Sequence, residues 1–193
     1  MKVAVLKYNA GNIHSMRIAL RRLGIEPVVT DDPNLLAEAD KVIFPGVGEA
    51  SSAMRYLQAR ELDKVLKNFN KPLLGICLGL QLMCRYSEEN DTRCLEIFDT
   101  AVRKFPPKDK VPHMGWNSIH QLKGALFQEV NEGEFVYFVH SYYAEFDGYT
   151  ASVSNYIVPF SASLNKSNYF AVQFHPEKSG AVGEQILKNF LNL

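Results

Sequence analysis

The chain has 193 residues, of which 47% are hydrophobic and 22% charged, with 21 basic residues against 21 acidic ones. A formal net charge of zero argues against nucleic acid or an anionic membrane surface as the main partner. No apolar run approaches the roughly 20 residues that span a bilayer, and the N-terminal stretch is too short and too interrupted for a signal peptide, so we expect a soluble cytoplasmic protein with one domain over residues 1–193.

The first half of the chain alternates between short apolar strands and amphipathic helices. In the first helix apolar residues recur at helical spacing, Asn12 is a suitable N-cap and Gly24 a suitable stop. This alternation predicts a parallel sheet covered by helices on both faces. The predicted strands span residues 2–7, 26–30, 41–44 and 72–76, and the predicted helices 12–24, 31–39, 49–58, 60–69 and 78–86.

From about residue 94 the chain is rich in strands instead. Gly, Pro, Asn and Asp separate these strands, and we find no linker long enough to divide two domains. The sequence therefore predicts an α/β fold, with an open, mostly parallel sheet flanked by helices and additional antiparallel strands in the second half. These strands are predicted over residues 94–105, 116–122, 135–146, 150–156, 161–165 and 169–174, before a closing helix over 182–192.

A cysteine stands between two glycines where the fourth strand meets a helix, in the run Gly75-Ile76-Cys77-Leu78-Gly79. Ligands of an open parallel sheet bind at the carboxyl ends of its strands, and Cys77 lies at such an end. A sharp turn that lifts a nucleophile out of the sheet crowds the backbone, and glycines at these two positions relieve the crowding. A helix N-terminus also favours the reactive thiolate. Cys77 is therefore a candidate nucleophile, although a buried structural cysteine would fit the same turn.

A thiol nucleophile needs a base, and the base needs a group that orients it. His175 follows an apolar strand, and Glu177 comes two residues later. Residues two apart in an extended segment project to the same side, and we expect Pro176 to keep the segment extended. A surface ion pair explains an isolated His-x-Glu equally well. The other histidines rank lower, although His140 could line the site through its backbone; they are His14, His113, His120 and His140.

The third strand ends in Pro-Gly-Val-Gly at the same predicted rim. The backbone N–H groups of Gly46, Val47 and Gly48 can face an anion, and with the N–H of Leu78 they form a candidate oxyanion hole. Such a donor typically contributes about 3 kcal/mol of transition-state stabilisation. A nucleotide loop is a poor alternative, because the run lacks the third glycine and does not follow the first strand.

The chain has two further cysteines. We expect Cys84 to face the core two helical turns after Cys77, and Cys94 to fill a strand. The odd number and the absence of CxxC spacing argue against a disulfide framework and a structural zinc site. We expect no metal and no cofactor.

The elbow cysteine, the upstream Pro-Gly-Val-Gly and the downstream His-Pro-Glu together resemble the class I, or triad, glutamine amidotransferase domain. GICLGLQ (75–81) is similar to the nucleophile motif of that family, and FHPEKS (174–179) to its histidine–glutamate motif. The resemblance covers essentially the whole chain, with no departure at the triad positions, and implies a flavodoxin-like sheet.

Further segments resemble one branch of that family, the glutaminase subunits of imidazole glycerol phosphate synthases. The segment 112–117 separates this branch from the anthranilate, GMP and carbamoyl-phosphate relatives. The segments are GN (11–12), PGVG (45–48), PHMGWN (112–117), YFVHSYYA (137–144) and QFHPEKS (173–179).

The resemblance implies a definite chemistry. Cys77 would attack the side-chain amide of L-glutamine, and a γ-glutamyl thioester would then be hydrolysed to glutamate. His175 would protonate the leaving ammonia and later activate water, while Glu177 positions His175. The glutamine would be held by Gln81 and the backbone around Ser141 and Tyr142.

The resemblance also implies a partner, a cyclase subunit with a (βα)8 barrel that uses the ammonia to make imidazole glycerol phosphate and an aminoimidazole carboxamide ribotide in histidine biosynthesis. Free ammonia escapes and is protonated in water, so this heterodimer needs a sealed joint. In the family the 46–48 peptides stay misaligned until the partner binds its ligand, so we expect negligible glutaminase activity from the chain alone. The docking surface of the family maps onto Asn12, Trp116, Asn117, Tyr137 and Lys178.

Three alternatives stay open at this stage. The chain could serve a different synthase with the same chemistry, such as one that amidinates surface sugars. It could be a stand-alone cysteine hydrolase of the same fold, which would need no partner and would leave the segment 112–117 unexplained. It could also be a non-enzymatic binding module, against which the intact Cys77, His175 and Glu177 argue.

Overall fold

The computed structural model describes residues 1–8 and 12–193, so Gly11 of the GN segment lies outside the described residues. In the first half the elements are β1 (Val3–Leu6), α1 (Ile13–Arg22), β2 (Val28–Thr30), α2 (Pro33–Glu38), β3 (Lys41–Phe44), α3 (Ala50–Ala59), α4 (Leu62–Lys67), β4 (Leu73–Ile76), α5 (Leu78–Met83), β5 (Tyr86–Ser87) and β6 (Thr92–Arg93). The second half adds β7 (Ala101–Lys104), β8 (His113–Ser118), η1 (Ala125–Phe127), β9 (Phe135–His140), β10 (Tyr142–Ala144), β11 (Thr150–Tyr156), β12 (Val158–Lys166), β13 (Tyr169–Val172), η2 (Pro176–Lys178) and α6 (Gly180–Leu191).

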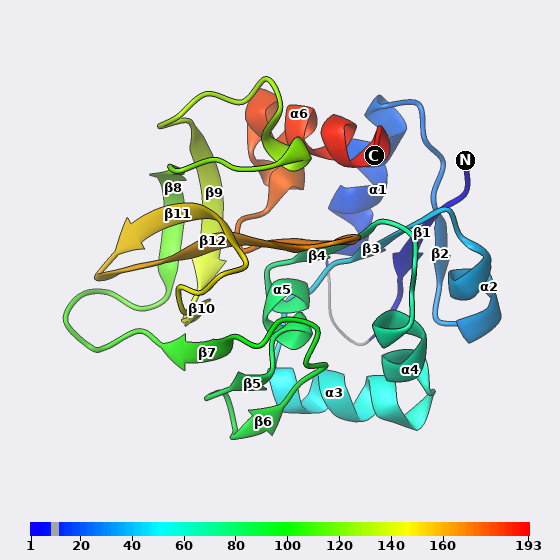
Figure 1. The fold of residues 1–193 in the computed structure, drawn as a ribbon, viewed down its shortest axis with the longest axis horizontal. Helices are drawn as coiled ribbons and strands as arrows, with labels where there is room; N and C mark the ends of the chain where they lie inside the picture. The colour runs from blue at the N-terminus through cyan, green and yellow to red at the C-terminus, as the bar shows by residue number, and fades with distance from the viewer. Residues whose placement is uncertain (9–11) are drawn as a thin grey trace.

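One sheet joins the parallel strands of the first half to antiparallel strands of the second (Figure 1). Its order is β2-β1-β3-β4-β13-β12-β10-β7-β5-β6, with β11 paired to β12. The strands from β2 to β13 are parallel neighbours, whereas β12 runs antiparallel to β13, β10 and β11. The predicted fold class is therefore confirmed. Strand β13 comes late in the chain but lies beside β4. The segment with Cys77, which follows β4, and the segment with His175, which follows β13, are therefore neighbours.

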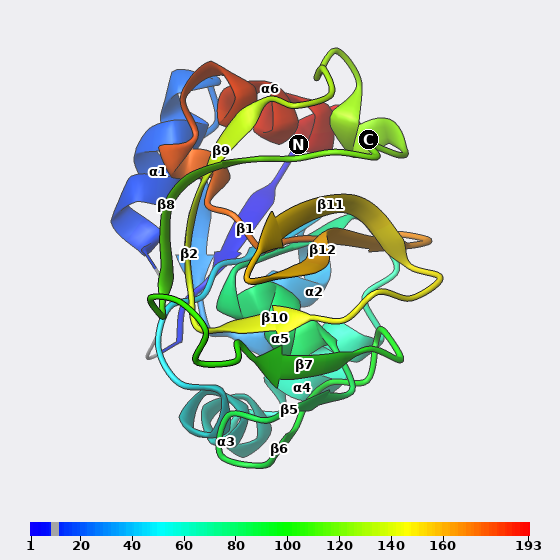
Figure 2. The same cartoon turned by 90° about the vertical axis from the view of Figure 1, so that its left-hand side faces the viewer.

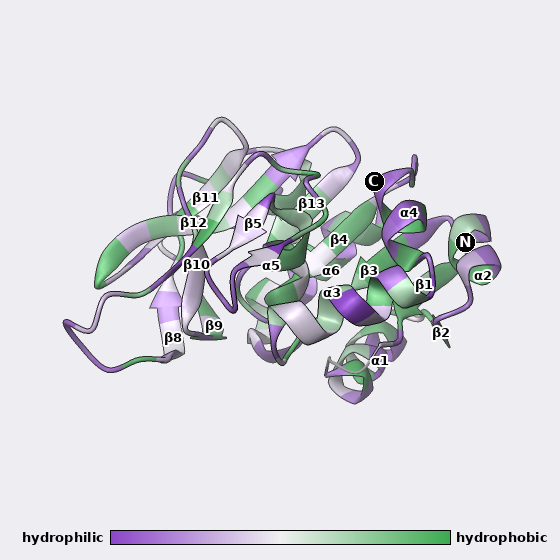
Figure 3. Ribbon diagram, turned by 90° about the horizontal axis from the view of Figure 1, so that it is seen from below, coloured by the Kyte–Doolittle hydropathy of each residue, from purple (hydrophilic) through white to green (hydrophobic). Residues whose placement is uncertain are grey.

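Helices cover both faces of the parallel strands, and each face has its own apolar core. One core packs α2, α3, α4 and α5 against the sheet, and the other packs α1 and α6 on the opposite face. In Figure 1, α1 and α6 lie above the sheet and α3 and α5 below it. Figure 3 shows the hydrophobic colour on the central strands and hydrophilic patches on the helices around them. The central strands β1, β3 and β4 are buried along their whole length, as expected for strands covered on both faces.

The strands β8 and β9 form a separate two-stranded ribbon outside this sheet (Figure 2). Its register pairs His113 with His140 and Trp116 with Tyr137. The backbone N–H of His175 donates to the Tyr137 carbonyl at 2.9 Å. The ribbon is therefore fixed to the segment that follows β13, next to the predicted site.

The helix predicted over 78–86 is too long, and the strand predicted over 94–105 starts too early. Helix α5 ends at Met83, and residues 94–100 form no strand, so Cys94 is buried outside a strand. The reason lies in hydrogen bonds: Leu95 N–H donates to the Leu82 carbonyl at 2.8 Å, and Ile97 N–H to the Met83 carbonyl at 3.0 Å. The last carbonyls of a helix need donors from outside it, and this segment supplies them instead of pairing in a sheet.

Over the part of the chain that the structure describes, none of the helices has both the length and the apolar character to cross a membrane.

Candidate active site

The carboxyl ends of β1, β3, β4 and β13 meet at one rim of the sheet, as parallel neighbours must. The register pairs Ile76 with Val172, and the N–H of Cys77 donates to the Val172 carbonyl at 2.8 Å. Residues 45–48, Cys77 and the segment 173–177 follow directly after three of these strands. This rim is where an open parallel sheet binds its ligands.

Cys77 occupies a strained backbone conformation, with φ 53° and ψ −108°. Both flanking glycines are required by close packing. A Cβ on Gly79 would stand 2.0 Å from the Phe44 carbonyl oxygen, and one on Gly75 would stand 2.4 Å from the Met83 sulfur. The turn is the elbow that the sequence predicts. A backbone held in a sparsely populated conformation, as at Cys77, is a feature of functional sites.

His175 and Glu177 form a buried pair. His175 Nδ1 lies 2.9 Å from Glu177 Oε1, and both side chains are 2% exposed. This contact fixes Nδ1 toward the carboxylate and leaves Nε2, which is buried and has no partner of hydrogen-bond geometry among the described residues. Burial opposes a charged ring, but the interactions with Cys77 and then Glu177 outweigh it and raise the pKa of His175 to about 10. An imidazolium beside the sulfur can supply a proton to a leaving group.

The segment after His175 is not extended, contrary to the expectation from Pro176. Residues Pro176–Lys178 form the 3-10 turn η2, with His175 at its N-cap position. Proline at the first helical position starts a turn readily, because its φ is already helical and its missing N–H needs no partner. The Ser179 hydroxyl donates to the His175 carbonyl at 2.7 Å and braces the turn. Glu177 thus reaches His175 around a tight turn, not along a strand.

The sulfur of Cys77 has polar neighbours that the sequence did not indicate. Cys77 makes no capping hydrogen bond to the N-terminus of α5. Instead Gln173 Nε2 donates to Cys77 Sγ at 3.6 Å, and the Val139 carbonyl lies 3.7 Å from the same atom. The sulfur at the N-cap of α5 therefore also has a buried amide and a backbone carbonyl as polar neighbours.

A cavity of about 310 Å³ opens over Cys77, at the small end of the range for ligand sites. Gln81 Nε2 donates to the Tyr142 carbonyl at 3.0 Å and to Gln173 Oε1 at 3.1 Å. The Ser141 carbonyl accepts from Phe105 N–H, so both carbonyls of the 141–142 segment are already occupied. The residues that line the cavity are Val47, Gly48, Cys77, Leu78, Gln81, Glu89, Pro112, Val139, His140, Ser141 and Tyr142.

The candidate oxyanion donors are only partly free. The Leu78 N–H donates to the Gly46 carbonyl at 3.3 Å, so the loop after β3 occupies the donor that an oxyanion would need. Gly46 is tightly enclosed, because a Cβ there would stand 2.5 Å from the Tyr8 hydroxyl oxygen and 2.6 Å from Leu78 Cβ. Gly48 has φ +120°. In this conformation the Leu78 N–H, one of the candidate oxyanion donors, is engaged within the protein.

The predicted docking residues separate into two groups. Trp116 is 55% exposed and packs edge-on against Tyr137 with ring centroids 6.1 Å apart, and Lys178 Nζ lies 5.7 Å from the centre of the Tyr137 ring. We call Trp116, Tyr137 and Lys178 the aromatic cluster. Asn117 instead donates to the Asn155 carbonyl at 3.0 Å. Asn12 precedes α1 without a side-chain cap.

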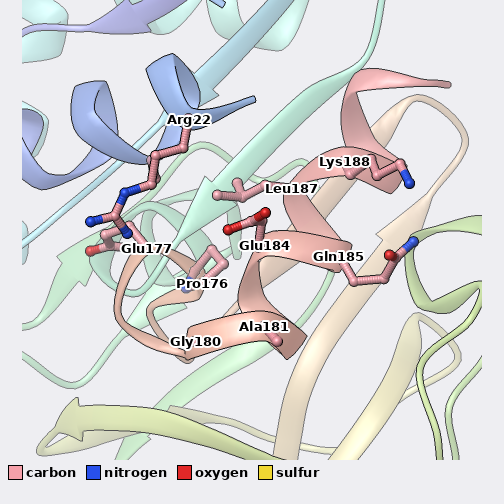
Figure 4. Close-up of a pocket in the computed structure, with 10 residues that line it drawn as sticks. Arg22, Pro176, Glu177, Gly180, Ala181, Glu184, Gln185, Leu187 and Lys188 are labelled. Carbon is pink, nitrogen blue, oxygen red and sulfur yellow. The ribbon is translucent and has the colours of Figure 1, made fainter. Parts of the chain in front are cut away.

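A larger cavity, of about 550 Å³, lies between α1 and α6 (Figure 4). Arg22 on α1 and Glu184 and Lys188 on α6 line it, and in Figure 4 the Arg22 side chain reaches toward Glu177. Neither Cys77 nor Gln81 borders it. The cavity over Cys77, although smaller, is therefore the one that borders the candidate nucleophile.

Sequence reasoning missed three residues at this rim: Tyr8, Glu89 and Gln173. Gln173 stands two residues before His175, and the rule that residues two apart share a side would have found it. Tyr8 follows β1 as the 45–48 loop follows β3, so the strand-end rule applied to every strand would have included it. No comparable signal marks Glu89, whose carboxylate accepts from Ala50 N–H at 2.7 Å.

The chain matches the family model described as "Glutamine amidotransferase class-I" over residues 5–193. Among curated relatives it is 58% identical to "Imidazole glycerol phosphate synthase subunit HisH" of Bacteroides thetaiotaomicron and 44% identical to the protein of that name from Escherichia coli K12, each over 100% of both chains. A Bacteroides fragilis relative of the same name is 59% identical with the same coverage.

Solved structures share the fold at lower identity. The PurLQS structure from Thermotoga maritima superposes with a TM-score of 0.76 and 20% identity, over 99% of this chain and 97% of that one. A structure described as a glutamine amidotransferase gives a TM-score of 0.76 and 17% identity, over 100% and 98%. Identities this low support the fold, whereas the full-length relatives above show the family. The chain belongs to the class-I glutamine amidotransferase family and, within it, to the HisH subunits of imidazole glycerol phosphate synthase.

Proposed function

We propose that the chain hydrolyses L-glutamine to glutamate and ammonia, and that Cys77, His175 and Glu177 carry the reaction. One observation supports this above all others: a strained elbow cysteine and a buried histidine–carboxylate pair converge at the same rim, and the sulfur contributes to the raised pKa of the imidazole. A thiolate and an imidazolium are the nucleophile and the acid that amide cleavage requires.

In the first half of the reaction the Cys77 sulfur bonds to the side-chain carbonyl carbon of glutamine. The C–N bond then breaks, and ammonia leaves with a proton from His175 Nε2. In the second half His175 takes a proton from water, the water oxygen bonds to the thioester carbon, and the C–S bond breaks to give glutamate. Glu177 holds His175 Nδ1 throughout, as the third member of a triad does.

The cavity provides a place for the amino-acid end of the substrate. Gln81 faces it with an amide held in one orientation, and the N–H groups of Ser141 and Tyr142 are the backbone groups left for a carboxylate. Glu89 adds a carboxylate suited to an ammonium group. Gly46, Val47, Gly48 and Leu78 form the oxyanion hole after the Gly46 carbonyl releases the Leu78 N–H.

We further propose that the ammonia passes to a (βα)8-barrel cyclase subunit in a heterodimer, since the HisH relatives are named as subunits of a synthase. An exposed Trp beside a half-buried Tyr, with a single cation, suits the centre of a protein interface, so the aromatic cluster is the proposed docking site, with Asn12 and Asn117 at its border. The whole chain, residues 1–193, acts as one amidotransferase domain.

The test is the variant Cys77→Ala in the complex with the cyclase subunit. We expect glutamine-dependent synthesis of imidazole glycerol phosphate to be abolished, while synthesis supplied with ammonium salt continues at the wild-type rate. Loss of both rates would assign Cys77 a structural role and contradict the proposed mechanism. Cys84→Ala, at a buried cysteine outside the cavity, is the matched control and should leave both rates intact.

A further inference from the structure

Two buried histidines, one of which lines the cavity over Cys77, take no part in the triad. His113 on β8 and His140 on β9 are 4% and 5% exposed, and their rings approach through His113 Nδ1 and His140 Nε2 at 3.0 Å. His140 Nδ1 lies 2.8 Å from the Tyr142 carbonyl oxygen, and His113 Nε2 lies 3.3 Å from Asn117 Nδ2. These contacts form one continuous row across three strands.

The chemistry of the partners fixes every proton in this row. A carbonyl oxygen only accepts, so His140 Nδ1 must carry the proton and its Nε2 must accept. His113 Nδ1 is then the donor, and its Nε2 accepts from Asn117. The Asn117 amide cannot turn around, because its Nδ2 also donates to the Asn155 carbonyl at 3.0 Å and its Oδ1 accepts from Ser118 N–H at 2.8 Å. Both histidines are therefore neutral Nδ1–H tautomers.

The surroundings agree with neutral rings. Burial lowers the pKa of His113 to about 4, and burial, with smaller contributions from neighbouring histidines, lowers the pKa of His140 to about 3. The His113 ring also stacks on Tyr156 and Phe138, with centroids 4.1 and 4.9 Å apart. The rings are thus held by packing, and their hydrogen bonds all point toward Tyr142.

The row ends on an atom that the site uses. The Tyr142 carbonyl accepts from His140 and also from Gln81 Nε2, and Gln81 in turn bonds Gln173, whose amide faces the Cys77 sulfur. We propose that His113 and His140 are positioning residues of the glutaminase site, which orient the Tyr142 peptide and through it the Gln81 side chain that faces the glutamine. The proposal rests on the glutaminase function proposed above.

A first experiment reads the tautomers directly in the full chain at pH 7. Long-range ¹H–¹⁵N spectra of a uniformly labelled sample distinguish protonated from bare ring nitrogens, and His113→Phe and His140→Gln samples assign the signals. We expect both rings to carry the proton on Nδ1 only. An Nε2–H tautomer or an imidazolium at either position would overturn the proposal, whatever the enzyme's activity.

A second experiment separates positioning from packing in the complex with the cyclase subunit and its ligand. His113→Phe keeps the stacked ring and removes both hydrogen bonds, so we expect KM for glutamine to rise about tenfold with kcat changed less than about threefold. His113→Asn restores a donor near the Nδ1 position and should recover most of the KM. Phe146→Ala, at an exposed position outside the ribbon and the cavity over Cys77, is the control and should leave both constants unchanged.

Equal KM values for wild type and His113→Phe would contradict the proposal, and so would equal losses in His113→Phe and His113→Asn, which would assign the ring to packing alone. Ammonium-dependent synthesis should be unchanged in both variants. If the wild-type complex itself does not turn over glutamine, the proposed function fails, and the tautomer spectra still decide separately whether the row exists.

Discussion

Three buried histidines in this molecule show how neighbours decide the charge of one residue type. Burial disfavours the charged ring at His113, His140 and His175 alike. No carboxylate contacts His113 or His140 among the described residues, and burial lowers their pKa values to about 4 and about 3. His175 faces Cys77 and Glu177, and its pKa rises to about 10. The neutral form of the side chain is therefore favoured at two sites and the charged form at the third, as the proposed roles of the three histidines require.

The raised pKa of His175 predicts how stability depends on pH. Its imidazolium stabilises the fold fully below the unfolded-state pKa of about 6.5, and this contribution is lost as the pH rises toward the folded-state value of about 10. Glu177→Gln removes the carboxylate that faces the charged ring at 2.9 Å. The difference in free energy of unfolding between wild type and Glu177→Gln should therefore shrink from pH 6 to pH 10, as measured by denaturant unfolding. A difference that is constant or grows with pH would contradict the assignment.

Tyr8 predicts a stabilising substitution. Its hydroxyl is buried and has no hydrogen-bond partner within the described residues, and burial, with the charge of Cys77, raises its pKa well above 10.0. Removing an unpaired buried hydroxyl relieves its desolvation cost, so Tyr8→Phe should raise the free energy of unfolding by roughly 1 kcal/mol. Thermal and denaturant unfolding of the full chain measure this.

The matched control for Tyr8 is Tyr169→Phe. The Tyr169 hydroxyl donates toward the carbonyls of Leu66 and Lys67 at 3.1 and 2.8 Å, so its loss should lower the free energy of unfolding by roughly 1 kcal/mol. The two variants remove the same atom and should shift stability in opposite directions. A destabilised Tyr8→Phe would show that its hydroxyl has a partner after all.

At the scale of elements, the parallel half of the sheet and most of its helices follow from the sequence, because their signals are local. Apolar runs of four residues, a proline at the start of α2 and the Gly-x-Cys-x-Gly elbow each specify their own conformation. The failures are non-local. Residues 94–98 resemble a strand but cap the end of α5, and Pro176 starts a turn where we expected an extended chain.

The site shows the same division. Cys77, His175 and Glu177 stand in short motifs, so their types and spacing reveal them. The Tyr142 carbonyl accepts two hydrogen bonds, and the Gln173 amide donates one to the Cys77 sulfur. These contacts depend on how β9, β10 and β13 lie beside α5, and no local sequence pattern encodes that arrangement. The engagement of Leu78 N–H by Gly46 likewise depends on a loop conformation.

The elbow itself predicts a severe substitution. A Cβ on Gly79 would lie 2.0 Å from the Phe44 carbonyl oxygen, which belongs to a buried central strand and cannot retreat. Gly79→Ala should lower the free energy of unfolding by about 2 kcal/mol or more, measured by denaturant unfolding. Gly148→Ala, where no atom of the described residues lies within 4 Å of the added carbon, is the control and should be nearly neutral. An unchanged Gly79→Ala would mean that β3 and α5 can separate freely.

At the scale of the whole molecule, the rim and the ribbon form one unit. The His175 N–H bonds the Tyr137 carbonyl, and the Ser179 hydroxyl accepts from Tyr137 N–H at 3.0 Å. Tyr137 of the aromatic cluster is therefore hydrogen-bonded through its backbone to His175, the proposed acid. A partner that binds Trp116 and Tyr137 would contact β9. The Val139 carbonyl of the same strand lies 3.7 Å from the Cys77 sulfur.

This arrangement predicts an enzyme that depends on its partner. Because the Leu78 N–H is engaged by the Gly46 carbonyl at 3.3 Å, we expect negligible glutaminase activity from the chain alone. A gain of at least about a hundredfold, equivalent to roughly 3 kcal/mol or one oxyanion donor, is expected when the cyclase subunit and its nucleotide ligand are added. Measuring glutamate release with each component omitted tests this, and high activity of the lone chain would contradict it.

The hydrogen bond between Leu78 and Gly46 also bears on how the cell can supply the two subunits. On the proposed mechanism, chains in excess of the cyclase subunit would not hydrolyse glutamine. The two subunits therefore need not be synthesised in equal numbers. A mutation that kept the Gly46 carbonyl away from the Leu78 N–H would let every unassembled chain consume glutamine without product. The loss of glutamine would grow with the expression level of the chain.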